Sequence, residues 1–227
     1  MNEGFRYHQL SSWNKLEKHP NASQGNDKRD SNLFEGGFKI RLDYQCIPEQ
    51  HITDVISRRY TAKEIRAFED FSLKELGTYL KWSVGRRFNE NTKRFYPSAG
   101  ANYPNHIFLF IKHHASIDNG LYWYDSEDHS IVNLSGNVNY EDALLQEGIA
   151  ANLCAVIASD FSLSYENYGE RGYRFCLLEA GHMAQNMMLI SNAIGWKSAP
   201  IGGFKDEVIN QLFGNEFKAL YLIPIGK

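Results

Sequence analysis

The sequence predicts an α+β sandwich built around one long central helix. Short runs rich in β-branched and aromatic residues are mixed with helical segments in an irregular order, and do not alternate one by one with helices. Two of these runs are separated only by the turn at 126–128, which predicts a hairpin. A stretch without proline, 171–196, predicts the long helix. This order favours an α+β fold over a doubly wound parallel sheet.

The first helices are expected after residue 59. Thr61 is a candidate N-cap for a helix over 62–71. Ser72 followed by Glu75 resembles a capping box, in which each residue satisfies a backbone N–H of the other. Leucine and valine then recur at helical spacing, so a second helix is expected over 73–84.

The remaining elements follow from residue type and segment length. Short helices are expected at 140–150 and 205–214, and the long helix should end at Gly195, which accepts a left-handed backbone. The predicted strands are β-branched and aromatic runs of ordinary strand length, at 106–113, 120–125, 129–134, 154–161 and 217–227.

Residues 1–50 are interpreted as an N-terminal arm, and 51–227 as a single domain. The middle of the arm, 17–32, is polar, rich in Pro, Gly, Asn and Ser, and without periodicity, so it is expected to be mobile. No apolar run reaches the roughly 20 residues of a membrane span, and the first residues lack the order of a signal peptide. A cytoplasmic protein is therefore expected.

Charge and cysteine content restrict the class of partner. The net charge is -3 with a pI near 6.2, so no overall field favours nucleic acid or an anionic membrane. Small molecules or proteins are the expected partners. Cys154 and Cys176 lie in apolar segments, and together with Cys46 they are interpreted as reduced thiols, with no disulfide framework and no metal site.

Two segments carry candidate anion or ligand sites. Arg58, Arg59, Thr61 and Lys63 lie at the predicted start of a helix, where backbone N–H groups favour a phosphate. The alternative is a solvated basic turn. After Ile201, Gly202 and Gly203 would let the backbone approach a planar ligand closely, although the same pair would serve any tight turn. Lys227 supplies a further cation after the last strand.

The long helix has an unusual polar face, formed by Glu179, His182, Gln185, Asn186 and Leu189 at spacings of three and four. This face would line a site or a subunit contact, or it would simply be solvated. The opposite seam is small and apolar and favours close packing of another helix; it comprises Leu177, Gly181, Ala184 and Met188. The sequence lacks the P-loop, the dinucleotide-binding glycine motif, the H-E-x-x-H zinc motif and the G-x-S-x-G elbow.

Six stretches follow one another along the chain: RRYTAK, YPSAGANYP, GLYWYD, YGERGYRFCLLEAGHMAQN, PIGGF and YLIPIGK. Taken together, their order and approximate spacing resemble those of the nitroreductase-like flavoproteins, and within them the SagB-type subgroup with its azoline dehydrogenases. The resemblance covers most of the chain from Ser57 to Lys227. The segment RYHQLSSWNK (6–15) also resembles an N-terminal motif of that subgroup.

The resemblance implies a homodimer that binds FMN at the subunit interface within a mixed, mainly antiparallel sheet flanked by helices. It implies that arginine contacts the FMN phosphate and that the hydroxyl and lysine face the ribityl chain and pyrimidine, with glycine N–H groups near the flavin edge. The residues carried over to cofactor binding are Arg58, Arg59, Thr61, Lys63, Pro97, Ser98, Ala99, Gly100, Gln185, Ile201, Gly202, Gly203 and Lys227.

One departure from the subgroup bears on the reaction. Azoline dehydrogenases carry a Lys-Tyr pair where this sequence has Asn167 and Tyr168. An amide is no base near neutral pH, so Tyr168 remains the candidate catalytic residue, or it is a packing tyrosine at a helix start. The expected function is ping-pong hydride transfer, as azoline oxidation or as NAD(P)H-dependent reduction of nitro or quinone compounds. Two further hypotheses are a catalytically silent scaffold in a peptide-modifying complex and a flavin-degrading enzyme of the same fold.

Overall fold

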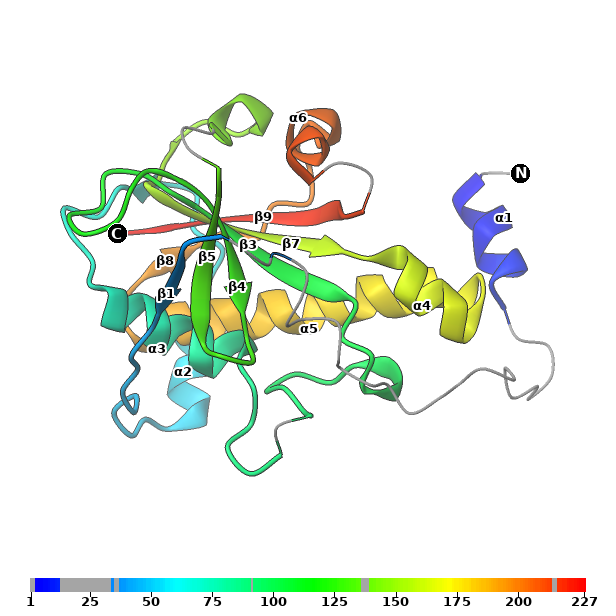
Figure 1. The fold of residues 1–227 in the computed structure, drawn as a ribbon, viewed down its shortest axis with the longest axis horizontal. Coiled ribbons are helices and arrows are strands. Elements are labelled where there is room, and N and C mark those ends of the chain that lie inside the picture. Colours follow the sequence, from blue (N-terminus) through cyan, green and yellow to red (C-terminus); the bar gives the residue numbers. More distant parts are fainter. Residues whose placement is uncertain (1–2, 13–33, 35–36, 91, 136–138, 214–215) are drawn as a thin grey trace.

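The computed structural model describes residues 3–12, 34, 37–90, 92–135, 139–213 and 216–227. Its centre is a seven-stranded sheet in the order β1-β5-β4-β3-β7-β9-β8, with every neighbouring pair antiparallel (Figure 1). The strands are β1 (Lys39–Arg41), β3 (Asn105–Ile111), β4 (Gly120–Asp125), β5 (Ser130–Ser135), β7 (Leu153–Ser159), β8 (Lys197–Ser198) and β9 (Lys218–Gly226). A separate parallel pair joins β2 (Ile65–Arg66) to β6 (Ile149–Ala150). The predicted α+β fold is confirmed.

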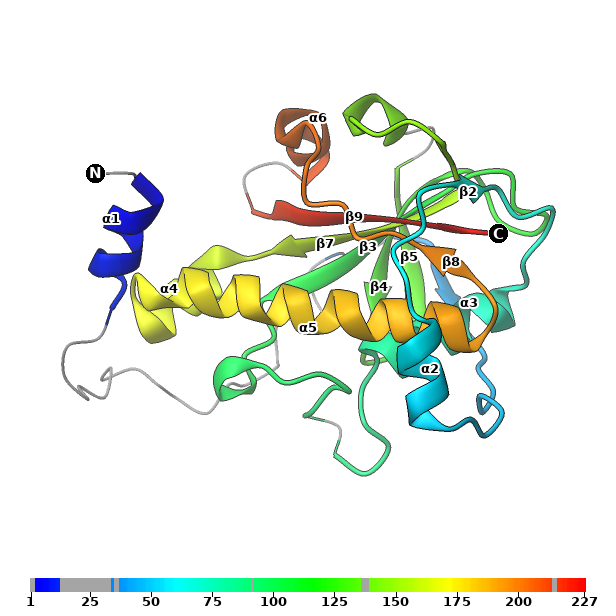
Figure 2. The same cartoon turned by 180° about the vertical axis from the view of Figure 1, so that it is seen from behind.

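Helices cover both faces of the sheet (Figures 1 and 2). On one face lie α2 (Ile52–Arg58), α3 (Leu73–Val84) and the long α5 (Arg171–Ala193), and on the other lies α6 (Asp206–Asn210). Successive strand side chains point to opposite faces, so Ile107 and Leu109 of β3 pack with the α3 and α5 core, while Phe108 joins the core beneath α6. The sheet is buried on both sides.

Several local predictions are confirmed. Ser72 and Glu75 form the capping box at the start of α3. The β4–β5 hairpin is present at the predicted turn. Gly195 follows the end of α5 with φ of 75°, a left-handed conformation that costs glycine no strain. Cys154 and Cys176 are buried and unpaired, and Cys46 is exposed and unpaired.

Two predicted helices are wrong. The 62–71 segment is extended because neighbouring strands occupy its backbone: Ala62 N–H donates to the Ser198 carbonyl, and Arg66 and Lys227 exchange two backbone hydrogen bonds. The 140–150 segment contains only a short 3-10 turn, Glu141–Ala143, before β6. In both cases pairing with distant strands overrides local helix propensity.

Three helices were not predicted from the sequence, and the first is α1 (Glu3–Leu10) in the N-terminal arm. The second is α2, whose last residue is Arg58, so the two arginines lie at a helix C-terminus and the helix start expected there is wrong. The third is α4 (Phe161–Tyr168), whose first residue was expected to end a strand. The signal for α4 was Asp160, whose carboxylate accepts from the backbone N–H groups of Ser162 and Leu163.

The N-terminal arm contains ordered elements at both of its ends. Its last part supplies β1, which extends the sheet, and its first part forms α1 (Glu3–Leu10). The Tyr7 hydroxyl donates to the Glu170 carbonyl at 2.6 Å, and Arg174 Nε donates to Ser11 Oγ at 2.7 Å. α1 thus lies against the start of α5, at the far end of the molecule from Lys227 (Figure 1). The predicted mobile stretch lies outside the described residues.

Membrane-spanning helices and metal clusters are both absent from the described ranges. Every helix there is too short or too polar to cross a lipid bilayer. In this part of the chain no three His, Cys, Asp or Glu side chains come together as a metal site.

Candidate functional site

A hollow of about 520 Å³ brings together five of the predicted binding residues from two distant segments. Thr61 and Lys63 line one side, and the loop of Ile201, Gly202 and Gly203 lines the other. We call it the glycine-loop hollow; its remaining lining residues are Ala62, Gln146, Glu147, Ile149, Ala199 and Pro200. A hydroxyl, an ammonium group and exposed peptide groups suit an anionic, partly planar ligand.

Backbone pairing holds the two sides of this hollow in place. Ala62 N–H donates to the Ser198 carbonyl at 3.2 Å, which ties the 61–63 segment to β8. Ile201 and Leu222 exchange two backbone hydrogen bonds, which anchors the glycine loop on β9. The hollow is therefore framed by the rigid edge of the sheet.

The two glycines of the loop are not required by the chain itself. A Cβ built on Gly202 would find its nearest atom, Tyr221 Cε1, at 3.7 Å, and one on Gly203 would lie 3.9 Å from Gln146 Nε2. Neither residue has a left-handed backbone, and both are exposed. Internal packing thus gives no reason for glycine here, whereas a ligand lying against the backbone does.

The two arginines lie at the end of α2 and not in the hollow. The Arg58 guanidinium donates to the Asp54 carbonyl within α2 and to Gln50 Oε1 just before that helix. Arg59 is half-buried and reaches α5, where its Nη1 lies 3.9 Å from Met188 Sδ. Arg59 therefore does not line the hollow, although only Tyr60 stands between it and Thr61 in sequence.

Two further predicted residues also lie elsewhere. The Lys227 backbone pairs with Arg66 beside the hollow, but its ammonium lies over the Phe68 ring, 5.8 Å from the centroid. Gln185 is exposed on α5 and does not line this hollow.

The predicted polar face of α5 is only partly solvated. His182 and Gln185 are exposed to solvent, whereas the Asn186 amide donates to the Ser83 and Phe95 carbonyls.

The remaining predicted cofactor residues, Pro97, Ser98, Ala99 and Gly100, form what we call the PSAGA loop (residues 97–101). This loop borders a second hollow of about 560 Å³, whose other lining residues are Arg87, Lys93, Arg94, Phe95, Tyr96 and Tyr103. The backbone is left-handed at Gly100, and also at Ala101 and Tyr103, where φ is 55° and 49°. Such strain in residues with a Cβ is concentrated at functional sites.

Tyr168 is the last residue of α4 and lies against the PSAGA loop. A Cβ on Gly100 would come within 2.1 Å of the Tyr168 hydroxyl oxygen, so that hydroxyl packs directly on the glycine. The ring also makes an edge contact with Phe175 at 4.9 Å between centroids. Burial raises the pKa of Tyr168, so the phenol keeps its proton at neutral pH. Its neighbour Asn167 donates to the Leu163 carbonyl within α4.

Two polar residues beside the PSAGA loop were not among the predicted binding residues. Asn102 is buried, and neither its amide oxygen nor its amide nitrogen has a hydrogen-bond partner among the described residues. Glu179 of α5 is buried beneath the loop, and its Oε1 accepts from the Asn105 N–H at 3.3 Å. In the sequence, Glu179 could have been identified as a site residue because it places a carboxylate between apolar neighbours on a long helix.

Burial raises the pKa of Glu179 to about 7, while hydrogen bonds from Ser98 and Asn105 and attraction to Arg94 act in the opposite direction. The carboxyl group is therefore poised between its neutral and ionised forms near neutral pH.

The glycine-loop hollow and the PSAGA loop lie beside different parts of α5. Figure 2 shows β8 beside the C-terminal end of that helix, whereas Ser98 of the PSAGA loop hydrogen-bonds to Glu179 in its first half. The two groups of residues thus border separate hollows in one chain.

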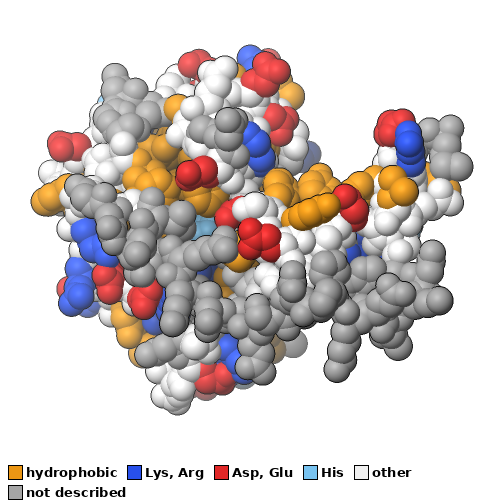
Figure 3. Space-filling view, turned by 45° about the vertical axis from the view of Figure 1, so that its right-hand side comes forward, with side chains coloured by type: hydrophobic (Ala, Val, Ile, Leu, Met, Phe, Trp, Pro, Cys, Tyr) orange, Lys and Arg blue, Asp and Glu red, His pale blue; other side chains and the backbone are white. Residues whose placement is uncertain are grey.

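Apolar side chains are exposed along the first half of α5 and on α4. Tyr165, Tyr173, Leu177 and Leu178 are each more than two-fifths exposed, and a Cβ on Gly181 would meet nothing within 4 Å. Figure 3 shows hydrophobic side chains gathered between the body of the molecule and the projecting α1. The second half of the predicted seam, Ala184 and Met188, is buried within the chain. The outward half is an exposed apolar surface.

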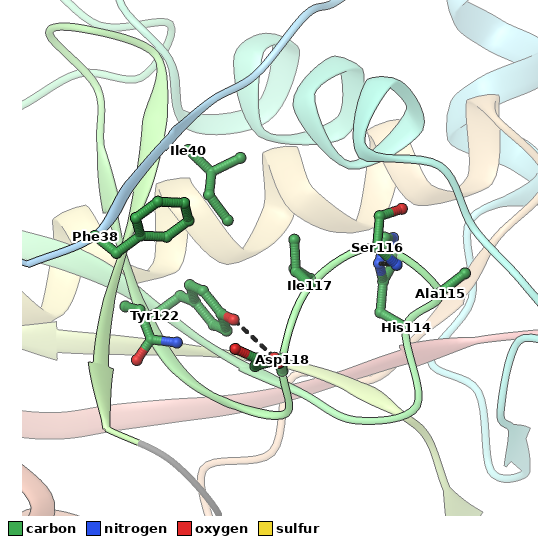
Figure 4. A pocket seen from close by; sticks show the side chains of 9 residues that line it. Phe38, Ile40, His114, Ala115, Ser116, Ile117, Asp118 and Tyr122 are labelled. Atoms are coloured by element: carbon green, nitrogen blue, oxygen red, sulfur yellow. Dashed lines mark hydrogen bonds between the residues drawn. The ribbon is translucent and has the colours of Figure 1, made fainter.

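A third hollow of about 350 Å³ lies at the other edge of the sheet, beside β1 (Figure 4). Its walls are the exposed Phe38, Ile40 and the loop of residues 114–118. The Tyr122 hydroxyl donates to the Asp118 carbonyl at 2.7 Å, which closes one side. None of the predicted site residues lies there.

Comparison with known proteins gives a consistent result for most of the chain. The model of the Nitroreductase family matches residues 56–227. A protein of Methanocaldococcus jannaschii that bears a nitroreductase name is 32% identical over 196 residues, which cover 84% of this chain and 98% of that protein.

Solved structures share the fold at low sequence identity. One named as a nitroreductase from Ralstonia eutropha matches with a TM-score of 0.71 and 18% identity, over 83% of this chain and 89% of its own. A chain of the E. coli microcin synthetase McbBCD complex with truncated pro-MccB17 bound matches with a TM-score of 0.64 and 18% identity, over 99% and 91%. One named as a nitroreductase from Exiguobacterium sibiricum, in complex with FMN, matches with a TM-score of 0.53 and 14% identity, over 79% and 89%.

Proposed function

Because the chain belongs to the Nitroreductase family, we propose that it is an FMN-dependent oxidoreductase that works by ping-pong transfer between two substrates. FMN, when bound, supplies the hydride chemistry, while the protein binds, orients and excludes water. The observation that carries the proposal is the glycine-loop hollow. Two glycines that the chain's own packing does not need face Thr61 and Lys63 across it.

The residues present fit such a cofactor. Lys63 and Thr61 offer an ammonium group and a hydroxyl to phosphate and ribityl oxygens, and the N–H groups of the glycine loop lie in an open, exposed backbone that a flavin ring can approach. Arg59 would complete the phosphate contact after turning from Met188. Beside the PSAGA loop, the side-chain amide of Asn102 has no hydrogen-bond partner among the described residues and could form hydrogen bonds with a ligand.

The separation of the two groups supports a homodimer in which one chain supplies the glycine-loop hollow and the other the PSAGA loop. On the first half of α5, Leu177, Leu178 and Gly181 form an exposed stripe, and two such helices could pack there closely because a Cβ on Gly181 would meet nothing within 4 Å. Each FMN would then contact both subunits.

The chemistry of α4 favours reduction over azoline oxidation. Oxidation would need a base to remove a ring proton, but the Asn167 amide is committed to the Leu163 carbonyl and the pKa of Tyr168 is raised by burial. A phenol that keeps its proton can instead donate a hydrogen bond to an electron-poor acceptor. We therefore favour an NAD(P)H-dependent reductase of nitro or quinone compounds.

The test is an FMN titration of the purified protein, followed by anaerobic addition of NADH or NADPH. Bound flavin that bleaches, and recovers its colour with a quinone, supports the reductase. Flavin that bleaches only with a heterocyclic peptide would assign the SagB-type oxidation instead. A protein that binds no FMN would refute the proposal and leave a binding scaffold.

A further inference from the structure

Glu179 joins α5 to both ends of a strained loop. Its side chain is 2% exposed, and Oε1 accepts from the N–H of Asn105, the first residue of β3. The Ser98 side chain also hydrogen-bonds to the Glu179 carboxylate. Ser98 Oγ in turn accepts from the Tyr103 N–H at 2.9 Å. One carboxylate therefore links residues 98, 103 and 105.

These links enclose the part of the chain with an unfavourable backbone. Gly100, Ala101 and Tyr103 all have positive φ, which side chains with a Cβ rarely adopt. A conformation of this kind persists only when its surroundings impose it. The hydrogen bonds converging on Glu179 impose it here, because they fix the residues on either side of the left-handed segment.

The charges that face Glu179 are few. Arg94, from the segment before the PSAGA loop, attracts the carboxylate, and the Cys176 thiol lies one turn earlier on α5. Burial raises the pKa of this thiol, which therefore stays neutral. Arg94 is itself held by the Tyr96 hydroxyl, to which its Nη1 donates at 3.0 Å, and it stacks over the Tyr103 ring. It is a fixed counter-charge.

A neutral glutamine would fill the same space and could accept the same N–H, so packing alone does not call for a carboxylate. A buried carboxylate is costly in free energy, and residues of this kind are retained where the charge has a use. The ionised form accepts from Ser98 and Asn105 together, whereas the protonated form turns one oxygen into a donor.

We propose that Glu179 is a positioning residue whose ionised carboxylate holds the PSAGA loop in the conformation that contacts FMN. The inference rests on the proposed function, since it assigns the loop to the cofactor. Acidification through neutral pH converts the carboxylate to the neutral acid, releases Ser98 and weakens FMN binding. Because the carboxyl group titrates near neutral pH, the change falls within the range in which the protein can be assayed.

The test compares the wild type with Glu179→Gln and with Glu207→Gln, a control in the exposed first turn of α6. FMN affinity is measured by fluorescence titration near pH 6 and near pH 8. Wild type and the control should bind about tenfold more tightly at the higher pH, because the ionised fraction of a carboxyl group with a pKa of about 7 rises from roughly a tenth to roughly nine-tenths between them. Glu179→Gln should bind FMN weakly, with the same affinity at both pH values. The same affinity and pH dependence in Glu179→Gln as in wild type would overturn the inference.

A second measurement separates this inference from the proposed function. Amide hydrogen exchange without FMN reports on the Tyr103 N–H, which donates to Ser98 Oγ. Faster exchange in Glu179→Gln at the higher pH supports the positioning role, and equal exchange overturns it. A wild type that binds no FMN would refute the proposed function, and exchange at Tyr103 would then decide on Glu179 alone.

Discussion

The Tyr168 hydroxyl lies directly on the Cα of Gly100, where a Cβ would come within 2.1 Å of Oη. Gly100 also has φ of 61°, so glycine is needed there both for space and for backbone conformation. The contact joins the end of α4 to the PSAGA loop, and hence the candidate catalytic residue to the candidate cofactor loop.

Gly100→Ala should destabilise the protein by more than the roughly 1–2 kcal/mol of a left-handed alanine, because the new methyl group also meets the phenol. Tyr168→Phe removes the clashing oxygen, so the double variant should recover part of the loss. Denaturant unfolding of the four proteins measures this coupling. Strictly additive changes would show that the two residues do not touch.

Tyr168→Phe alone should leave FMN content and the melting temperature nearly unchanged, because the ring contact with Phe175 remains. Turnover with a quinone should fall about tenfold or more if the hydroxyl donates a hydrogen bond to the acceptor, consistent with a phenol whose pKa is raised. Steady-state kinetics with matched flavin loading make the comparison. Equal rates would leave Tyr168 as a packing residue.

Lys63→Ala should weaken FMN binding roughly tenfold to a hundredfold, the range expected for one lost charge-assisted hydrogen bond. Lys74→Ala is the matched control, since Lys74 lies on α3, away from the hollow. Fluorescence titration at two salt concentrations gives the affinities. Equal losses in both variants would indicate a general charge effect and would remove Lys63 from the site.

Leu178→Asp should separate the proposed dimer, because it places a charge in the exposed stripe on α5, where the leucine is 59% exposed. FMN affinity should fall with it, since each site would lose the residues of the other chain. Leu212→Asp, at an exposed leucine outside the stripe, is the control. Sedimentation velocity reports the mass. A Leu178→Asp protein that remains dimeric would place the interface elsewhere.

Glu179→Gln should change how stability depends on pH. The pKa of Glu179 is raised on folding from about 4.5 to about 7, so its contribution to the free energy of unfolding is fully present below pH 4.5 and is lost as the pH rises through 7. Relative to Glu179→Gln, the free energy of unfolding of the wild type should fall by up to ~3 kcal/mol between these pH values. Urea unfolding at several pH values makes the comparison. A constant difference would mean that the carboxyl has an ordinary pKa.

Local sequence signals predicted the elements that depend on neighbouring residues. The Ser72–Glu75 capping box, the hairpin turn and Gly195 each act within a few residues, and all three are confirmed. The 62–71 helix failed because its backbone N–H groups meet residues from the end of the chain, such as Ser198 and Lys227. No local pattern contains that information.

The candidate site was predictable in composition but not in arrangement. The stretches RRYTAK and PIGGF do meet, as the hollow around Thr61 and Gly202 shows. The helix start expected at Arg58 and Arg59 was wrong because α2 ends there. The separation of the PSAGA loop from that hollow depends on the length and direction of α5, which only the folded chain reveals.

The position of β9 has a kinetic consequence. This strand lies between β7 and β8, and more than fifty residues of chain separate it from β7. Loop-closure entropy makes such long-range pairing slow, so β9 should join late in folding. Since Ile201 and the 61–66 segment both depend on residues of β8 and β9, the ligand site would assemble in that last step. A trapped intermediate would thus carry a packed β3–β4–β5 meander and yet be unable to capture a ligand.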